Sequence, residues 1–252
     1  MYASVTGADG RPVRNLTARD FSLREDDEPQ AVTTFAAGEF PAAVALAIDR
    51  SFSMAGRPLT TAKTAAQVFL GALRAEDRAM LIGIGGQVEV LAPASVDRAA
   101  MRQALEAMDA WGTTALHDAI IESVDLLEPE SGRRAIVVLS DGEDRYSTAR
   151  AEDVVARVRR STVMVYPIAI GRTRPALFAE LAAVSGGTSF HLRDAKALAA
   201  TLETIAEDLR WQYLLGYQPA RPWNEAVEWR SLSVTVPRKG LRVRARSGYT
   251  TQ

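Results

Sequence analysis

Short apolar runs alternate with amphipathic segments through the middle of this sequence. The run AAVALAI at residues 42–48 has no polar interruption, which is typical of a strand covered on both faces of a sheet. Apolar residues then recur at helical spacing, namely Leu59, Ala62, Ala66, Phe69, Leu70 and Leu73. This alternation predicts a doubly wound α/β fold, with a mostly parallel sheet flanked by helices.

Further strands are predicted at residues 78–84, 87–93, 135–140 and 163–170. The first two flank Gly85-Gly86, so we expect a hairpin that places one antiparallel strand at the sheet edge. The run AIVVLS at residues 135–140 is expected to be a central strand. The α/β core is therefore predicted to span residues 41–210.

Capping residues mark several of the predicted helices. Asp97 is expected to cap the helix that carries Met101, Leu105 and Met108. The other helices are predicted at residues 116–127, at 149–160, between Pro175 and Gly186-Gly187, and at 198–209 with Asp194 as its cap.

The two ends of the chain have strand-like patterns instead. Residues 24–30 (REDDEPQ) form an acidic turn between two such pieces, and residues 231–236 and 241–246 flank Lys239-Gly240, a hairpin signal. We expect residues 1–40 and 211–252 to pair in a small β module beside the α/β core.

Composition removes several classes of protein. The 252 residues include 30 basic and 31 acidic side chains, so no overall field attracts nucleic acid or an anionic membrane. No cysteine is present, which excludes disulfides, thiolate ligands and cysteine nucleophiles. The first twenty residues lack the apolar core of a signal peptide, and no segment has the roughly 18 apolar residues of a membrane span. The start inside the strand-like run YASVTG is compatible with a fragment boundary.

Oxygen side chains gather where the first strand of the core ends. Asp49, Ser51 and Ser53 alternate with Arg50 and Phe52 in IDRSFSM. Ligands bind at the carboxyl ends of the strands in doubly wound sheets, so this position favours a site over a simple helix cap, which needs one oxygen only.

Three kinds of chemistry fit this stretch poorly. An aspartyl-phosphate enzyme of the haloacid dehalogenase type needs a second carboxylate where Ser51 stands. Neither the Gly-x-Ser-x-Gly elbow of a serine hydrolase nor a phosphate-binding glycine loop is present. A hard-cation site remains, and Mg²⁺ needs about six oxygen ligands, so other loops must contribute. The candidates are the hydroxyls in WGTTALHDAI (residues 111–120) and the carboxylate in LSDGED (residues 139–144).

These three segments together resemble the metal-ion-dependent adhesion site (MIDAS) of von Willebrand factor A (VWA) domains. That pattern is Asp-x-Ser-x-Ser, a distant Thr, and a distant Asp followed by Gly. The resemblance covers about residues 41–210, and the flanking segments are similar to those of a bacterial group of VWA-related proteins. It implies a Rossmann-like VWA fold and a bacterial protein acting outside the cytoplasm, in the periplasm or secreted.

The resemblance also implies a set of metal-binding residues, which are Asp49, Ser51, Ser53, Thr114 and Asp141. The serines and the threonine are expected to ligate Mg²⁺, or Mn²⁺ or Ca²⁺, directly, and one or both aspartates through water. A free coordination position would take an Asp or Glu carboxylate of a partner protein. The family often has Gly-Gly-Thr where this chain has Gly-Thr-Thr, and we favour Thr114 over Thr113 by its distance from the following Ala-Leu.

The leading hypothesis is therefore a divalent-cation-dependent, adhesion-type protein-binding module and not an enzyme. Two alternatives stay open at this point, a Mg²⁺-dependent phosphohydrolase that uses Asp49 and a scaffold with a vestigial metal site. If the loop that carries them is exposed, Phe52 and Met54 are candidates for contacting the partner, with packing in the core as the alternative.

Other polar and aromatic features are given structural interpretations. Glu143 and Asp144 are expected to form a solvated acidic turn, and His117 and His191 lack neighbours at metal-binding spacing. The alternating arginines at 242, 244 and 246 are interpreted as one solvated strand face rather than a nucleic-acid site. The aromatic residues at 211, 213 and 217 are expected to pack between the core and the β module.

Overall fold

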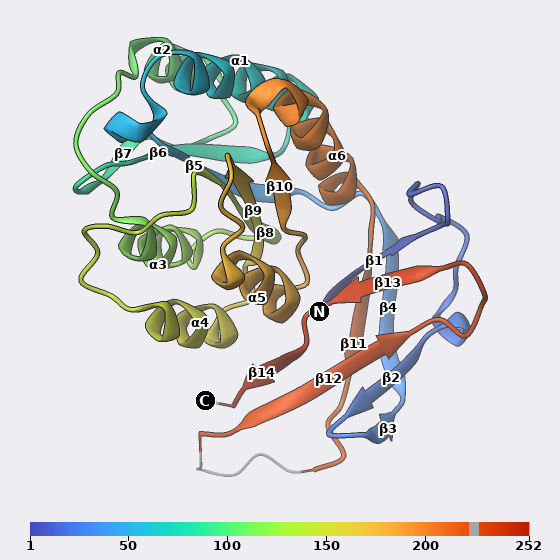
Figure 1. The fold of residues 1–252 in the computed structure, drawn as a ribbon. Helices are drawn as coiled ribbons and strands as arrows, with labels where there is room; N and C mark the ends of the chain where they lie inside the picture. Colours follow the sequence, from blue (N-terminus) through green and yellow to red (C-terminus); the bar gives the residue numbers. More distant parts are fainter. Residues whose placement is uncertain (222–226, 252) are drawn as a thin grey trace.

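A six-stranded sheet occupies the centre of the α/β part of the molecule, and a group of antiparallel strands lies beside it (Figure 1). The structure is a computed structural model, and it describes residues 1–221 and 227–251. The central sheet has the order β10-β9-β8-β5-β6-β7. Its strands are β5 (Ala42–Asp49), β6 (Arg78–Ile84), β7 (Val88–Ser95), β8 (Arg133–Ser140), β9 (Met164–Ile170) and β10 (Phe190–Leu192).

All neighbouring strands of this sheet are parallel except β6 and β7. The predicted antiparallel edge strand is therefore confirmed. Strand β10 was not predicted; it is only three residues long and pairs with β9 at the opposite edge. Such a short strand has too few positions for a periodic pattern to be visible.

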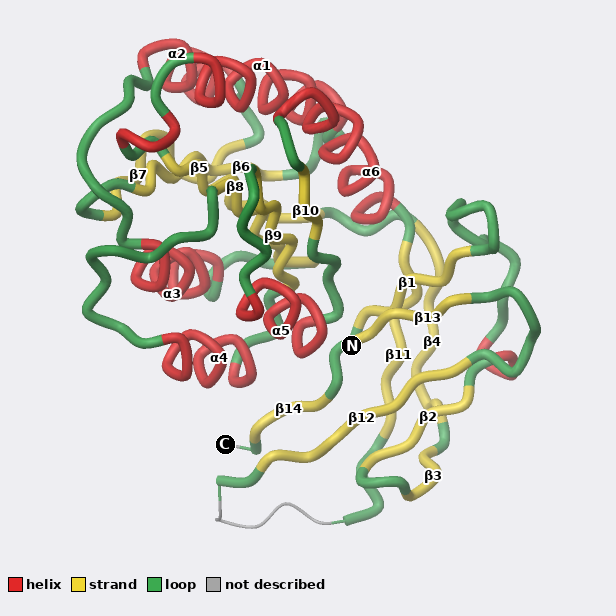
Figure 2. The backbone as a smooth tube through the Cα atoms, in the orientation of Figure 1, coloured by secondary structure: helices red, strands yellow, loops and turns green. Residues whose placement is uncertain are grey.

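Helices cover both faces of the sheet (Figure 2), which confirms the doubly wound prediction. Helices α1, α2 and α6 pack on one face of the sheet through a cluster of buried apolar side chains, and α3, α4 and α5 pack on the other face through a second cluster. The helices are α1 (Arg57–Ala72), α2 (Ala99–Ala107), α3 (Leu116–Leu127), α4 (Ala151–Arg160), α5 (Ala176–Ser185) and α6 (Leu198–Arg210). None of the described helices has the length and apolarity that crossing a bilayer requires.

Strand β5 explains why its sequence is apolar without interruption. Val44, Leu46 and Ile48 pack against the α1 and α6 side, whereas the intervening alanines pack against the α3 side. Every residue of the strand is buried, and alternate side chains point to opposite faces. Asp49 ends the strand, so the first polar residue after the run lies at its carboxyl end.

Caps largely follow the sequence. Asp97 Oδ1 accepts the Ala99 N–H at 2.9 Å at the start of α2, and Gly186 ends α5 in the left-handed conformation. Asp194 differs from expectation, because it caps the short 3₁₀ helix η3 (Ala195–Ala197) through the Lys196 N–H, and α6 begins only after η3.

Strands from the two ends of the chain pair in two four-stranded sheets, together called the β module below. One sheet has the order β13-β1-β11-β4 and the other β14-β12-β2-β3. The strands are β1 (Tyr2–Thr6), β2 (Ser22–Glu25), β3 (Glu28–Gln30), β4 (Val32–Gly38), β11 (Gln212–Tyr217), β12 (Trp229–Thr235), β13 (Arg242–Ala245) and β14 (Gly248–Thr250). The domain boundaries near residues 41 and 210 stay a prediction.

The hairpin expected around Lys239-Gly240 is wrong. Strand β12 pairs with β2 and β14, whereas β13 pairs with β1 in the other sheet. Val234 of β12 and Val243 of β13 pack on the same apolar interior of the β module. The two strands therefore face that interior from different sheets, and the chain crosses between the sheets at the turn.

The solvated strand face expected for the C-terminal arginines is also wrong for two of the three. Arg244 Nη2 lies 2.6 Å from Asp208 Oδ1 on α6, and Arg246 Nη2 donates to the Arg159 carbonyl of α4 at 3.1 Å. These side chains join the β module to the α/β part. Arg242 remains exposed.

Two of the three aromatic residues after α6, the tyrosines at 213 and 217, pack differently from expectation. Tyr213 lies in the core of the β module, where its ring contacts Phe21 and Phe35. The Tyr217 hydroxyl donates to Glu25 of β2. Both side chains thus stabilise the β module itself rather than its contact with the core.

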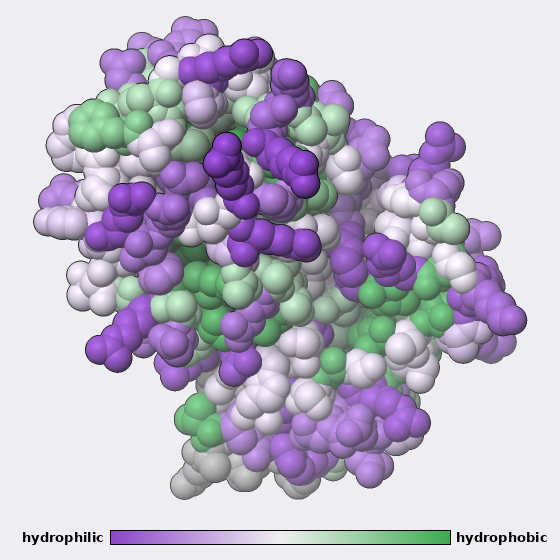
Figure 3. All heavy atoms as spheres, in the orientation of Figure 1, coloured by the Kyte–Doolittle hydropathy of each residue, from purple (hydrophilic) through white to green (hydrophobic). Residues whose placement is uncertain are grey.

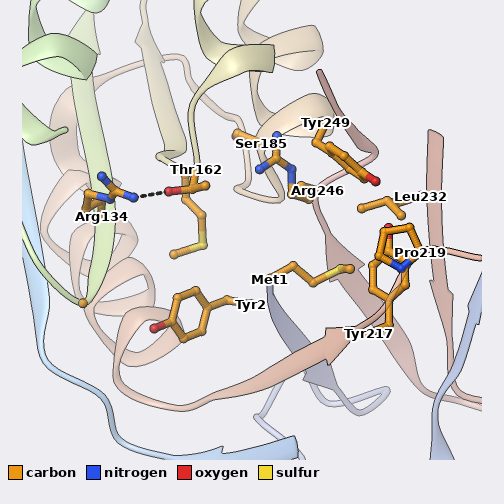
Figure 4. A pocket seen from close by; sticks show the side chains of 12 residues that line it. Met1, Tyr2, Arg134, Thr162, Ser185, Tyr217, Pro219, Leu232, Arg246 and Tyr249 are labelled. Carbon is orange, nitrogen blue, oxygen red and sulfur yellow. Dashed lines mark hydrogen bonds between the residues drawn. The ribbon is translucent and has the colours of Figure 1, made fainter. Parts of the chain in front are cut away.

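An open cavity of about 360 Å³ lies between the two parts of the molecule (Figure 4). Tyr217 and Tyr249 of the β module line one side, and Arg134 and Thr162 of the α/β part line the other. Arg134 and Thr162 lie near the amino ends of β8 and β9, whereas Asp49 lies at the carboxyl end of β5. The cavity is therefore at the opposite end of the parallel strands from Asp49.

Candidate functional site

Asp49 is fully buried at the carboxyl end of β5, and neutral groups surround its carboxylate. Oδ1 accepts the Ser51 N–H at 2.9 Å, and Oδ2 accepts the Ser140 hydroxyl at 2.6 Å. Among the described residues, no Lys, Arg or His forms an ion pair with it. Burial raises the pKa of the Asp49 carboxyl, against the hydrogen bonds from Ser140 and Ser51, and the neighbouring Asp141 raises this pKa further.

The two serines after Asp49 lie on one short turn. Residues Phe52–Met54 form the 3₁₀ helix η2, in which the Met54 N–H donates to the Ser51 carbonyl. This turn brings the Ser51 and Ser53 hydroxyl oxygens to 3.0 Å from each other. Ser51 is buried and Ser53 is exposed, so the pair leads from the interior to the surface.

The same turn separates the two apolar residues of the loop. Phe52 is 68% exposed, whereas Met54 is buried in the core beside α1. Only Phe52 is therefore accessible to a partner.

A second loop, residues 109–115, packs directly on the first. The Trp111 N–H donates to the Arg50 carbonyl at 2.6 Å, and the Phe52 N–H donates to the Gly112 carbonyl at 3.1 Å. Gly112 has φ +77°, a conformation that favours glycine, and a Cβ there would lie 3.3 Å from the Gly86 nitrogen. The glycine thus permits the close approach of this loop to the turn after β6.

Thr113 and Thr114 differ in their surroundings. Thr114 is buried, whereas Thr113 is half-buried with its methyl group beside Gly86. The preference for Thr114 stays a prediction. Within the described residues, no hydrogen bond links the Thr114 hydroxyl to the other four predicted site residues.

A third loop carries Asp141 after β8. The Arg145 and Tyr146 N–H groups donate to the Thr114 carbonyl at 2.9 and 3.0 Å, which ties this loop to the second. Gly142 has φ +83°, and a Cβ there would lie 2.2 Å from Pro175 Cγ. Only glycine fits between Asp141 and the loop that precedes α5.

Asp141 is half-buried and shares a cavity with Ser53. Three of the five predicted residues are linked by hydrogen bonds, because the Ser51 N–H donates to the Asp49 carboxylate and the Ser51 and Ser53 hydroxyls contact each other. Asp141 lies near this group, since it lines a cavity with Ser53 and its charge raises the pKa of Asp49. The fifth, Thr114, is held near them by backbone hydrogen bonds of its own loop.

Ser140 was not among the residues predicted for the site. Its hydroxyl donates to Asp49 and accepts the Gly142 N–H at 3.0 Å, so it connects the first and third loops. Ile48 pairs with Leu139 in the parallel ladder, which places Ser140 beside Asp49. The available signal was a polar residue at the end of an otherwise apolar strand.

Asp144 also has a role that the acidic-turn prediction did not include. Its Oδ1 accepts the Leu116 N–H at 2.8 Å and the His117 N–H at 3.2 Å, which caps α3 from a distant loop. The prediction of a solvated turn is therefore wrong for Asp144. Glu143 is exposed and pairs with Arg145.

The two histidines contact backbone carbonyls. His117 Nδ1 lies 3.1 Å from the Ala149 oxygen, and His191 Nε2 lies 3.0 Å from the Gly171 oxygen. These contacts agree with the structural roles that we expected.

The chemistry of the grouped side chains suits a hard cation. They offer only oxygen atoms, from three hydroxyls and two carboxylates, and such ligands suit Mg²⁺, Mn²⁺ and Ca²⁺. Within residues 1–221 and 227–251, no cluster of three or more His, Cys, Asp or Glu side chains has the arrangement of a metal site. A cation here would depend mainly on hydroxyl groups.

Comparison with known proteins agrees with the fold. Residues 44–143 match the family model described as the von Willebrand factor type A domain. No curated protein sequence matches the chain.

Solved structures similar to this chain include a von Willebrand factor type A protein from Catenulispora acidiphila, with 18% identity and a TM-score of 0.63 over 75% of this chain and 50% of that one. An aerotolerance-related membrane protein from Bacteroides fragilis has 20% identity and a TM-score of 0.56, over 67% of this chain and 98% of that one.

Proximal thread matrix protein 1 from the mussel byssus, with a zinc-occupied MIDAS motif, has 14% identity and a TM-score of 0.61, over 74% of this chain and 50% of that one. The present chain thus spans about half the length of the Catenulispora and mussel chains. At these identities the likeness concerns the fold.

Proposed function

We propose, from the match of residues 44–143 to the von Willebrand factor type A domain model and the shared fold, that this chain is a divalent-cation-dependent protein-binding module. Domains of this family are generally protein-interaction modules. The single observation that carries the proposal is the buried Asp49 carboxylate, which has hydrogen-bond donors around it but no cationic side chain among the described residues paired with it.

A buried carboxylate without a counter-charge is costly, and a bound cation removes that cost. In the proposed site Ser51, Ser53 and Thr114 ligate the cation directly, and one or both of Asp49 and Asp141 act through water. Neutral hydroxyl ligands leave the cation under-neutralised, so it keeps its attraction for an external carboxylate. An Asp or Glu side chain of a partner protein is the proposed occupant of the remaining position.

The surface around these residues supports protein binding. Phe52, Trp111 and Tyr146 are 68%, 56% and 66% exposed, and each belongs to a different one of the three loops. The backbone N–H of each aromatic residue donates to a neighbouring loop, so all three are held by a fixed backbone. Exposed aromatic residues around a polar centre are typical of protein interfaces.

A phosphohydrolase that uses Asp49 receives no such support. The position of its general acid is taken by Ser51, whose hydroxyl is engaged with Ser53. The zinc-occupied MIDAS motif of the mussel protein supports metal binding by the shared fold. Similarity to a bacterial membrane protein supports our further proposal that the module acts outside the cytoplasm.

Calorimetric titration with Mg²⁺ and with Mn²⁺ tests the metal site. We expect the intact protein to bind one cation, and Asp49→Ala and Asp141→Ala to lose that binding. Glu143→Ala is the matched control, because Glu143 is an exposed carboxylate on the same loop as Asp141. Absence of binding by the intact protein, or undiminished binding by both aspartate variants, would refute the proposal.

A further inference from the structure

An open cavity of about 500 Å³ adjoins the candidate site on one side. Ser53 and Asp141 are among the residues that line it. Basic residues from three segments line it as well: Arg57 at the start of α1, Arg193 after β10, and Lys196 in η3. The cavity therefore brings two of the proposed site residues and three basic residues together.

These three basic side chains have no acidic partner in the part of the chain that the structure describes. Among residues 1–221 and 227–251, none of them forms an ion pair or a side-chain hydrogen bond. Other cations near the site are satisfied, since Arg50 pairs with Glu89 and Arg145 with Glu143.

Two acidic residues, Asp141 and Asp194, line the cavity beside the three basic ones. Asp141 belongs to the proposed cation site, and Asp194 Oδ1 accepts the Lys196 backbone N–H. Two further exposed arginines, Arg172 and Arg174, lie on the loop that Pro175 holds against Gly142. Figure 3 shows strongly hydrophilic side chains gathered on this face, over β9 and β10. With a divalent cation bound, the positive charges of the cation and the lining side chains outnumber the negative ones.

A single partner carboxylate on the cation would leave these three basic side chains without an anionic partner. Unpaired guanidinium and ammonium groups in a partly enclosed cavity attract anions, and arginine can hold a carboxylate through two parallel hydrogen bonds. A volume near 500 Å³ also exceeds what one carboxylate needs.

We propose that the partner of this module presents an acidic segment, with one carboxylate at the cation and at least one more on Arg57, Arg193 and Lys196. This inference rests on the proposed function and specifies the partner of the same site. It predicts a segment with clustered Asp or Glu residues instead of an isolated acidic residue.

Fluorescence anisotropy with two labelled peptides tests the inference. One probe contains eight consecutive glutamates, and the other has a single glutamate among glycines and serines of the same length. In saturating Mg²⁺ we expect the intact protein to bind the first at least tenfold more tightly, and to lose most of that binding in EDTA.

A charge-matched pair of variants locates the effect. R193E/K196E should lose the preference for eight glutamates while keeping the calorimetric Mg²⁺ binding. K239E/R242E makes the same change in net charge on exposed residues of the β module and should keep the preference. All four side chains are exposed, and circular dichroism checks that both variants fold.

Each contrary result has a distinct meaning. Failure of Mg²⁺ to bind would overturn the proposed function itself. If Mg²⁺ binds but the two peptides bind equally, or both double variants lose the preference equally, only the acidic-segment inference is overturned. Tighter binding of a phosphoserine peptide of equal charge would also overturn it, in favour of a phosphorylated partner.

Discussion

Two buried carboxylates, one in each part of the molecule, are stabilised in different ways. Glu25 in the β module lies 3.1 Å from Arg230 Nη1, and both side chains are buried. The hydroxyls of Tyr217 and Tyr249 also donate to it. Asp49 in the α/β part is buried as well, but its donors are a hydroxyl and an amide.

The difference separates a structural carboxylate from one that is prepared for a ligand. Glu25 has its counter-charge within the chain, so it needs nothing from solution. The charged residue that influences the Asp49 carboxyl is Asp141, which is also acidic. Its negative charge adds to the rise in the Asp49 pKa that burial causes. We propose that an external cation supplies the counter-charge that Asp49 lacks among the described residues.

The largest effect on stability is expected when the buried ion pair of Glu25 and Arg230 is broken. Arg230→Ala leaves Glu25 buried without its cation, and we expect a loss of about 3–5 kcal/mol in the free energy of unfolding. Urea denaturation measures it. Arg11→Ala is the control, because Arg11 pairs with Asp9 on an exposed turn and should change stability by less than about 1 kcal/mol. Equal effects in both variants would remove the distinction between the two carboxylates.

The next effect concerns the contact between the two parts. Arg244→Ala removes the pair with Asp208, and we expect about 2 kcal/mol of destabilisation because the lost hydrogen bond is charge-assisted. Arg242→Ala, two residues earlier on the same strand and exposed, should change stability by less than about 0.5 kcal/mol. A stability change in Arg244→Ala as small as that of Arg242→Ala would contradict the assignment of Arg244 to this contact.

A smaller effect is expected from the hydroxyl that positions Asp49. Ser140→Ala removes its hydrogen bonds to Asp49 and Gly142, and we expect cation affinity to fall by about tenfold. Ser161→Ala removes a buried hydroxyl near the amino end of β9, which is the end of the strands away from Asp49. This control should leave cation affinity unchanged. Calorimetry on both variants compares them directly, and equal affinities would show that Ser140 does not position Asp49.

The smallest effect is expected at the exposed aromatic residues. Phe52→Ser should alter the free energy of unfolding by less than about 0.5 kcal/mol and leave Mg²⁺ affinity unchanged. Met54→Ser in the same loop is the contrast, because Met54 is buried and its loss should destabilise the fold strongly. Strong destabilisation by Phe52→Ser would assign Phe52 to the fold and remove it from the proposed interface.

The α/β part was largely predictable because its patterns are local. A run such as residues 42–48 is apolar at every position because both of its faces are covered, and this pattern is visible without knowing the order of the strands. The β module was less predictable, since its pairings are not local. Lys239-Gly240 has the composition of a hairpin turn, but the partners of the flanking strands are β1 and β2 at the far end of the chain.

Glu25 illustrates the same limit of local patterns. It lies in an acidic stretch, and residues 24–30 have the composition of an exposed turn. Its burial depends on Arg230, which is 205 residues away. The alternating spacing of the C-terminal arginines likewise predicted that Arg244 and Arg246 share one face of a strand. It could not show that the α/β part of the molecule covers that face.

The site was predictable where its residues are close in sequence. Asp49, Ser51 and Ser53 share one turn, so their spacing indicates their grouping. Ser140 and Asp144 act across loops through strand register and helix capping, and no spacing in the sequence reveals those contacts. The segments that contain Thr114 and Asp141 were candidates because they adjoin a predicted helix and a predicted strand, but these two residues were assigned to the site through the family resemblance. Their part in binding a cation remains a prediction.

Urea denaturation of the intact protein and of Asp49→Asn, each in EDTA and in Mg²⁺ at about 100 times its Kd, tests most directly whether Asp49 is prepared for an external cation. The intact protein should gain about 2.7 kcal/mol in Mg²⁺ by mass action. Asp49→Asn should gain almost nothing, and in EDTA it should be at least as stable as the intact protein, because the substitution removes a buried charge. An equal gain in both proteins, or no gain in either, would contradict the account.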